Sequence, residues 1–141
     1  MNNKIYFIIL CFLALLTSCD NEESFPKIRV SHSIPITMPE WNNVYSNNWG
    51  YNYIDNVGLG GIIIVQAIDN EFIAYDRACT FEKNNGCIIS GEYINDTMLK
   101  CTGCCNSQFN IIDGSIFQGP ANQALKRYNT YFDGQILYIT N

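Results

Sequence analysis

The fold of this chain is decided by residues 74–128, in which three stretches stand out. They read AYDRACTFEKNNGC at 74–87, LKCTGCCNSQFNIIDGS at 99–115 and GPANQALKRY at 119–128. Five cysteines lie in the first two stretches, whereas the single histidine of the chain, His32, lies far upstream. Cysteines gathered in this way predict disulfide bridges or a thiolate metal site.

The three stretches resemble, in the same order, the landmarks of a Rieske iron–sulfur domain. In the Rieske pattern a C-x-H box and a C-x-x-H box each supply one Cys and one His, so that two thiolates hold one iron and two imidazoles hold the other. The resemblance covers roughly residues 58–141 and is closest to small Rieske-like lipoproteins of Gram-negative bacteria, many of which vary the ligand set. It implies a Rieske-like antiparallel β-sandwich or small barrel, with two Cys-bearing loops at one end.

The pattern of polar and apolar residues predicts the same all-β class. Residues 27–37 alternate as in a half-buried strand, with His32 on the apolar side, and 62–65 with 72–75 form a hairpin. Residues 39–56 are expected to be a long loop with one short strand. Further short strands are expected at 92–94, 98–101, 108–112, 115–117 and 135–139. Many short strands without a long amphipathic helix favour a sandwich or a small barrel.

The resemblance assigns roles to single residues. Cys79 matches the cysteine ligand of the first box, but Phe81 occupies its histidine position, and a phenyl ring has no lone pair to donate to iron. Ser107 matches a serine whose hydroxyl bonds a cluster sulfur. Residues 119–121, with Pro120 at their centre, resemble the proline loop that shields the cluster. These matches imply a retained fold and a degenerate cluster site.

The second box can be aligned in two registers. Anchoring on Ser107 puts Cys105 at the histidine position, Cys104 at the disulfide position and Thr102 at the position of the cysteine ligand. Anchoring on Cys101 as the ligand puts Cys104 at the histidine position instead. Neither register recovers a histidine.

Two uses of the five cysteines therefore stay open. In the main expectation there is no cofactor. The resemblance then implies that Cys87 pairs with Cys104, and Cys79 is expected to pair with Cys101 or Cys105. In the alternative, thiolates drawn from the five bind a [2Fe-2S] cluster or a tetrahedral Zn²⁺. The thiolates favoured for such a metal site are Cys79, Cys101, Cys104 and Cys105.

The N-terminus predicts export and lipidation. Residues 1–18 read as a lipoprotein signal peptide, with Lys4 before an apolar segment at 5–16 and a lipobox-like sequence that ends at Cys19. Palmitate and other acyl chains on Cys19 would anchor the protein in a membrane. Residues 19–26 form an acidic tether, and 27–141 form the Rieske-like domain. The expected location is the outer membrane of a Gram-negative bacterium, on its periplasmic or surface face.

Net charge and carboxylate spacing argue against two classes of function, nucleic-acid binding and acid–base catalysis. The net charge of −5 argues against nucleic acid as a partner, and the carboxylates, Asp76 among them, show no paired spacing and are interpreted as solvated. The sequence thus predicts a non-enzymatic envelope lipoprotein with a structural or binding role. One alternative is an electron-transfer protein with a Cys-ligated [2Fe-2S] cluster and an envelope redox partner. Another is a carbohydrate or peptide binder built on four exposed rings, Trp41, Trp49, Tyr51 and Tyr53.

Overall fold

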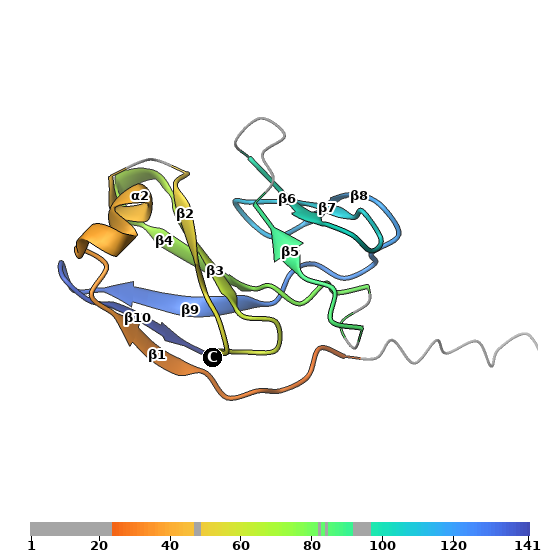
Figure 1. Cartoon of the computed structure of the whole chain (residues 1–141), viewed down its shortest axis with the longest axis horizontal. Coiled ribbons are helices and arrows are strands. Elements are labelled where there is room, and N and C mark those ends of the chain that lie inside the picture. Colours follow the sequence, from red (N-terminus) through yellow and green to blue (C-terminus); the bar gives the residue numbers. More distant parts are fainter. Residues whose placement is uncertain (1–23, 47–48, 82, 84, 92–96) are drawn as a thin grey trace, which may run out of the picture.

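The computed structural model describes residues 24–141 except 47–48, 82, 84 and 92–96. Two antiparallel sheets form the framework of this part of the chain, as Figure 1 shows. The larger sheet has the order β1-β10-β9-β4-β3-β2, and the smaller has the order β5-β6-β7-β8. The predicted all-β fold is therefore confirmed.

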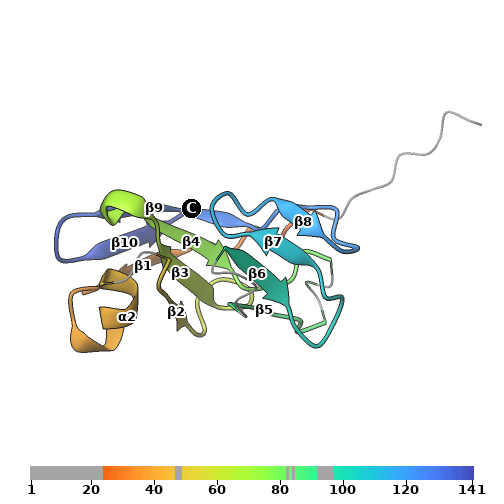
Figure 2. The ribbon, with the colours of Figure 1, turned by 90° about the horizontal axis from the view of Figure 1, so that it is seen from above.

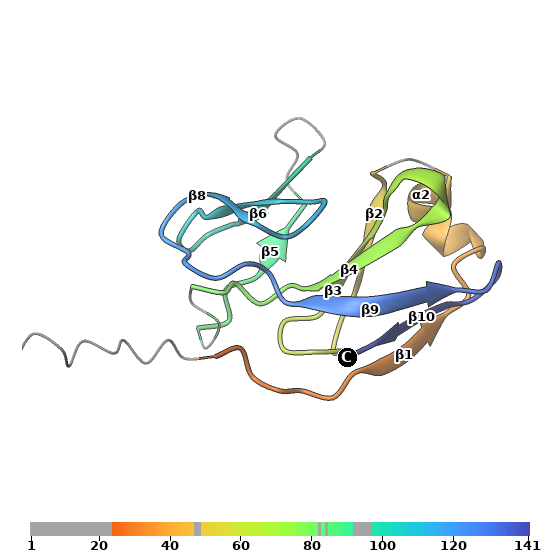
Figure 3. The ribbon, with the colours of Figure 1, turned by 180° about the vertical axis from the view of Figure 1, so that it is seen from behind.

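The larger sheet combines strands from both ends of the domain. Its members are β1 (Ser31–Ile34), β2 (Tyr51–Ile54), β3 (Ile62–Gln66), β4 (Phe72–Asp76), β9 (Arg127–Phe132) and β10 (Leu137–Thr140). The smaller sheet is made of β5 (Ile89–Ser90), β6 (Met98–Cys101), β7 (Gln108–Asn110) and β8 (Ile116–Gln118). Figures 1 and 3 show the smaller sheet to one side of the larger one, with helix α2 (Asn42–Tyr45) at the opposite side.

Strand β3 is buried on both of its faces, which explains its unbroken run of apolar residues. Ile63 and Val65 point into one hydrophobic core, whereas Ile62 and Ile64 point into another, because successive side chains of a strand alternate between faces. The sequence shows no polar alternation here since neither face meets water. This strand therefore joins two cores.

The first core, which we call the thiol-side core, lies where the two sheets meet. Its buried members are Ile63, Val65, Ala67, Ile73, Tyr75, Cys79, Cys87, Ile89, Leu99, Cys101, Phe109, Ile111, Ala121 and Leu125. The second, which we call the half-barrel core, lies inside the curl of the larger sheet, seen from above in Figure 2. Its buried members are Val30, Ile34, Ile36, Trp41, Val44, Ile62, Ile64, Phe72, Ala74, Tyr128, Leu137 and Ile139.

The strand expectations that fall on described residues are confirmed. The hairpin of β3 and β4, the alternating first strand and the strands near 98–101, 108–112, 115–117 and 135–139 are all present. The expected strand at 92–94 lies outside the described residues. Strand β5, with only two residues, was not expected. His32 is half-buried opposite Ile139 in the pairing of β1 with β10.

The stretch 39–56 also differs from the long loop that the sequence suggested. It contains the 3-10 turn η1 (Pro39–Trp41) and helix α2 as well as β2. Such short helical turns cover too little of a 3.6-residue period to be recognised in a sequence. Within the described residues, no helix is both long and apolar enough to cross a membrane.

The aromatic residues of this stretch do not form the exposed platform that a carbohydrate or peptide binder would need. Trp41 is buried in the half-barrel core, whereas the other three rings are partly buried against the thiol-side core. The Tyr51 hydroxyl donates to the carbonyl of Gly91 at 2.8 Å, and the Tyr53 hydroxyl accepts from the Gly91 amide at 2.9 Å. Because packing uses these rings in two different cores, the expectation of a single binding surface was wrong.

Asp76 is fully buried, which contradicts its interpretation as a solvated charge. Its carboxylate accepts hydrogen bonds from the amides of Leu59, Gly60 and Ala78 at 2.7–2.9 Å and from the Tyr128 hydroxyl at 2.7 Å. One side chain thus joins the 58–61 loop, β4, the first cysteine loop and β9. The four bonds compensate for the loss of water around the carboxylate.

Candidate functional site

Three cysteine thiols converge at the thiol-side core, where the two sheets meet. Cys79 follows β4, Cys101 ends β6 and Cys105 lies in the loop from β6 to β7. Their three Sγ atoms all lie within 4.8 Å of one another, and the Sγ atoms of Cys79 and Cys105 are 3.4 Å apart. Cys79 and Cys101 are fully buried, whereas Cys105 is half-buried.

Backbone hydrogen bonds shape the two loops that carry these thiols. The Cys79 amide donates to the Cys87 carbonyl at 2.8 Å, which closes the first loop on itself. The Cys101 amide donates to the Ser107 carbonyl at 2.9 Å, which closes the second loop. Inside the second loop Gly103 and Asn106 both adopt positive φ, the conformation that tight turns use glycine and asparagine for.

A disulfide between Cys87 and Cys104 ties the two loops together. The Cα atoms of the pair are 6.1 Å apart, and 17 positions separate them in the sequence. This is the pairing that the family resemblance implied. The second expected bridge, from Cys79 to Cys101 or Cys105, is not formed. The distance of 3.4 Å between the Cys79 and Cys105 sulfurs suits a thiol hydrogen bond, whereas a disulfide needs about 2.05 Å.

The disulfide also distinguishes the two registers of the second box. Since Cys104 is bonded to Cys87, the register anchored on Ser107 fits, and Cys105 stands at the histidine position. In that register Thr102 should be the ligand, but its hydroxyl lies 3.1 Å from that of Ser90. Cys101 supplies the thiol instead. Three residues separate Cys101 from Cys105, one more than separate the Cys from the His of a C-x-x-H box. The sequence therefore fitted two alignments.

Ser107 links the thiol site to the 119–121 loop by hydrogen bonds. Its side chain is fully buried, and its Oγ accepts hydrogen bonds from the Cys105 thiol and from the Ala121 amide, both at 3.1 Å. These contacts join the second cysteine loop to the 119–121 loop. A further link is the Thr80 hydroxyl, which donates to the Gln123 carbonyl at 2.7 Å. Pro120 is exposed, and its shielding role stays a prediction.

Gly119 allows the close approach of these two loops. A Cβ at this position would lie 2.6 Å from the Ser107 Cα, and its φ of +110° disfavours any other residue. We expect Gly119→Ala to lower the free energy of unfolding by about 1–3 kcal/mol, because the loop must move or strain. Urea denaturation measures this effect.

Gly134 provides the matched control for that substitution. It has a similar φ of +102°, and a Cβ there would meet nothing within 4 Å. Gly134→Ala therefore carries the same backbone penalty without the steric contact. Equal losses in the two variants would show that the approach of Gly119 to Ser107 is unimportant.

The environment makes the thiols unequal as acids. Burial, followed by a hydrogen bond with Cys79, raises the pKa of Cys101 well above the ordinary thiol value. Burial also acts to raise the pKa of Cys105, but hydrogen bonds with Ser107, Cys79 and Cys101 outweigh it and leave that pKa lowered. Cys105, the most accessible of the three thiols, therefore ionises more readily than Cys101.

The spacing of the sulfurs fits one thiophilic metal ion. Three atoms within 4.8 Å of one another all lie within about 2.8 Å of a common point, which is close to the ~2.3 Å of a zinc–thiolate bond. Soft thiolate ligands select zinc, Cu(I) or iron in iron–sulfur centres. The three thiols can therefore act as a metal site after a small contraction.

The cluster of the Rieske pattern does not fit the residues present. Phe81, at the first histidine position, is 48% exposed and has no donor atom, and Cys105 replaces the second histidine. His32 lies in the larger sheet, on β1. A wholly Cys-ligated cluster needs four thiolates, but Cys87 and Cys104 are bonded to each other. The expected ligand set with Cys104 in it is therefore wrong for this disulfide-bonded form.

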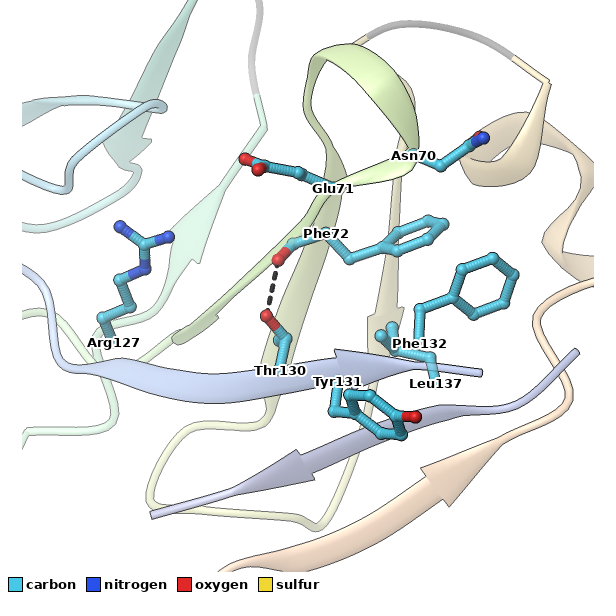
Figure 4. Close-up of a pocket in the computed structure, with 8 residues that line it drawn as sticks. All are labelled: Asn70, Glu71, Phe72, Arg127, Thr130, Tyr131, Phe132 and Leu137. Atoms are coloured by element: carbon cyan, nitrogen blue, oxygen red, sulfur yellow. Dashed lines mark hydrogen bonds between the residues drawn. The ribbon is translucent and has the colours of Figure 1, made fainter. Parts of the chain in front are cut away.

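A separate groove lies on the larger sheet, away from the cysteine loops. Figure 4 shows the rings of Phe72 and Phe132 next to each other in its lining, in an edge-to-face contact with ring centroids 5.1 Å apart. The Thr130 hydroxyl donates to the Phe72 carbonyl at 2.7 Å, and Arg127 lies toward the other end. Its lining among the described residues contains no cysteine.

The comparisons with known proteins concern the fold. No protein-family model and no curated protein matches the sequence. A solved complex of reduced oxygenase and oxidized ferredoxin in carbazole 1,9a-dioxygenase matches with a TM-score of 0.52 and 16% identity, over 69% of this chain and 87% of that one.

Two further solved structures are similar at a lower TM-score. The plasma membrane Rieske protein PetC3 of the cyanobacterium Synechocystis PCC 6803 has a TM-score of 0.49 and 22% identity, over 64% of this chain and 84% of that one. A putative NADH-dependent nitrite reductase small subunit from Mycobacterium tuberculosis has a TM-score of 0.47 and 11% identity, over 81% and 96%. At identities below about 25%, a likeness to solved structures concerns the fold alone.

Proposed function

We propose that this Rieske-like domain is an electron-transfer module whose redox-active metal is held by the thiolates of Cys79, Cys101 and Cys105. The observation that carries the proposal is the convergence of three sulfurs within 4.8 Å, from the two loops that hold the cluster in the Rieske pattern. Thiolate ligation favours a soft or borderline metal such as iron or copper. The proposal replaces the cofactor-free role that the sequence favoured.

The surroundings of the thiols suit a metal centre. Two of the three ligands are fully buried, which limits access by oxidants and water. The Cys87–Cys104 disulfide fixes the two loops relative to each other without using any of the three sulfurs. Ser107 lies in contact with Cys105 and can donate its hydroxyl hydrogen to the thiolate, which stabilises the charged ligand.

Metal analysis of the full chain, purified without oxygen, tests this function. We expect about one metal ion per chain, with visible absorption from sulfur-to-metal charge transfer. Cys101→Ser should abolish the absorption, because an alcohol is a poor ligand for a soft metal. Thr102→Val, which changes the neighbouring residue that the other register would have made a ligand, should retain it.

The opposite result is equally clear. A folded, colourless protein without bound metal under these conditions would exclude the electron-transfer role. It would favour the structural or binding role that the sequence predicted first. Loss of the metal in Thr102→Val, together with its retention in Cys101→Ser, would show that residue 102 and not Cys101 is the ligand position.

The location of the protein is part of the same proposal. Cys19 is the lipidated first residue of the mature protein, which is anchored to the outer membrane of a Gram-negative bacterium and meets a redox partner in the envelope. The lipobox-like sequence before Cys19 supports this arrangement. Mass spectrometry of the N-terminal peptide should find acylated Cys19 and no residues 1–18. Cys19→Ser should leave the signal peptide attached, and an unmodified Cys19 in the native chain would contradict the anchor.

A further inference from the structure

The contact between Cys79 and Cys105 has the geometry of a dithiol ready to oxidise. Their sulfurs are 3.4 Å apart, so a movement of roughly 1.4 Å would bring them to the length of a disulfide bond. The two residues lie in different loops, which are already joined by the Cys87–Cys104 bridge. A second bond between them would therefore need no large rearrangement of the backbone.

The two thiols differ in their access to solvent. Cys105 is half-buried and can be reached by an external reagent, whereas Cys79 is fully buried and can be reached only from inside the site. Exchange reactions of disulfides need one thiolate that attacks the external disulfide and a second that resolves the mixed disulfide. The exposed and buried members of this pair match those two roles.

We propose that Cys105 and Cys79 form a reversible redox couple, in which Cys105 reacts first with an external disulfide and Cys79 then closes an internal bridge. The couple operates in the metal-free chain and does not depend on the proposed metal. Closing the bridge would remove two of the three thiolates from the metal site. The site thus has two exclusive forms, one with three thiols and one with a disulfide and the Cys101 thiol.

The reaction balances with a small disulfide such as oxidised glutathione. The Cys105 thiol loses its proton, and the thiolate attacks one sulfur of the reagent, which forms a mixed disulfide and releases one glutathione thiolate. Cys79, after losing its proton, attacks the sulfur of Cys105 and releases the second glutathione thiolate. Two protein thiols are oxidised to one disulfide, the reagent is reduced to two thiols, and the two protons pass to the released thiolates.

Cys101 is excluded from the pair by its position. It is fully buried, so an external disulfide cannot reach it before Cys105. As the resolving thiol it is less suited than Cys79, because Cys101 belongs to strand β6, where it pairs with Ile89 of β5, whereas Cys79 lies outside the named strands. Cys101 therefore stays a thiol when the bridge closes.

Peptide mapping of the full chain in glutathione buffers tests the couple. The chain is stripped with a chelator, equilibrated from reducing to oxidising buffer, quenched with an alkylating reagent in denaturant, so that buried thiols also react, and digested. We expect a Cys79–Cys105 bridge in oxidising buffer, an alkylated Cys101, and return of both thiols in reducing buffer. Circular dichroism confirms that the chain stays folded in each buffer. Metal content is not a readout, so a failure of the metal centre leaves this test unaffected.

Variants separate the two roles. Cys79→Ser should accumulate a glutathione mixed disulfide on Cys105, because the resolving thiol is missing. Cys105→Ser should leave Cys79 alkylated and free of glutathione, and the control Cys101→Ser should still form the bridge. A bridge that contains Cys101, equal glutathione labelling of Cys79 and Cys105, or full alkylation of all three thiols in oxidising buffer would each overturn the proposal.

Discussion

Replacing Asp76 by alanine is expected to lower the free energy of unfolding by about 3–5 kcal/mol. Three backbone amides and the Tyr128 hydroxyl would lose their acceptor in the interior, and each buried donor left without a partner costs roughly 1–3 kcal/mol. Water entering the space vacated by the side chain would recover part of this loss. Small domains have a free energy of unfolding of only about 5–15 kcal/mol, so this substitution should remove a large fraction of it.

Urea denaturation of Asp76→Ala, with Tyr128→Phe as the matched control, measures this effect. The phenylalanine variant removes only one of the four bonds and keeps the carboxylate with its three amide donors. We expect it to lose about 1 kcal/mol. A loss of free energy of unfolding in Asp76→Ala no greater than that in Tyr128→Phe would show that the three amide hydrogen bonds of Asp76 do not stabilise the domain. If Asp76→Ala fails to fold, Asp76→Asn, which keeps one acceptor oxygen, should fold with an intermediate loss.

Removing the Cys87–Cys104 bridge has the second large expected effect. The double variant Cys87→Ala/Cys104→Ala should lose about 3 kcal/mol, because a bridge over 17 positions restricts the unfolded chain by about that amount. Urea denaturation in the presence of a chelator measures it without a contribution from bound metal.

Cys105→Ala provides the control for this prediction. It changes a neighbouring cysteine outside the bridge, is only half-buried, and should cost less than 1 kcal/mol. If the double variant is as stable as Cys105→Ala, the bridge does not stabilise the domain. The cysteine loops would then be fixed by their hydrogen bonds alone.

The sequence predicts the strands well where burial leaves a pattern. The unbroken apolar runs of β3 and β4 and the alternation around β1 identify strands, because the period of two and the absence of polar residues follow directly from the surroundings of a strand. Strand β5 has only two residues, which is too short for any period to appear. The helical turn at 42–45 was missed for the same reason.

The candidate site could be predicted only in part. The resemblance implied the Cys87–Cys104 bridge, but the grouping of Cys79, Cys101 and Cys105 depends on how two loops fold back on themselves, which no local pattern records. The extra residue in the second loop was visible only as two competing alignments. The burial of Asp76 was missed because its partners are mostly backbone amides, which carry no signal in the sequence.

Strand β3 contributes side chains to both hydrophobic cores, and this arrangement makes the domain cooperative. If either core opened alone, it would expose one side of a strand whose other side is still packed. The thiol-side core includes Cys79 and Cys101 themselves, so their burial is maintained by the same free energy that keeps the whole domain folded. Protection of these two thiols from solvent is therefore a global property of the fold, whereas the reactivity of Cys105 is a local one.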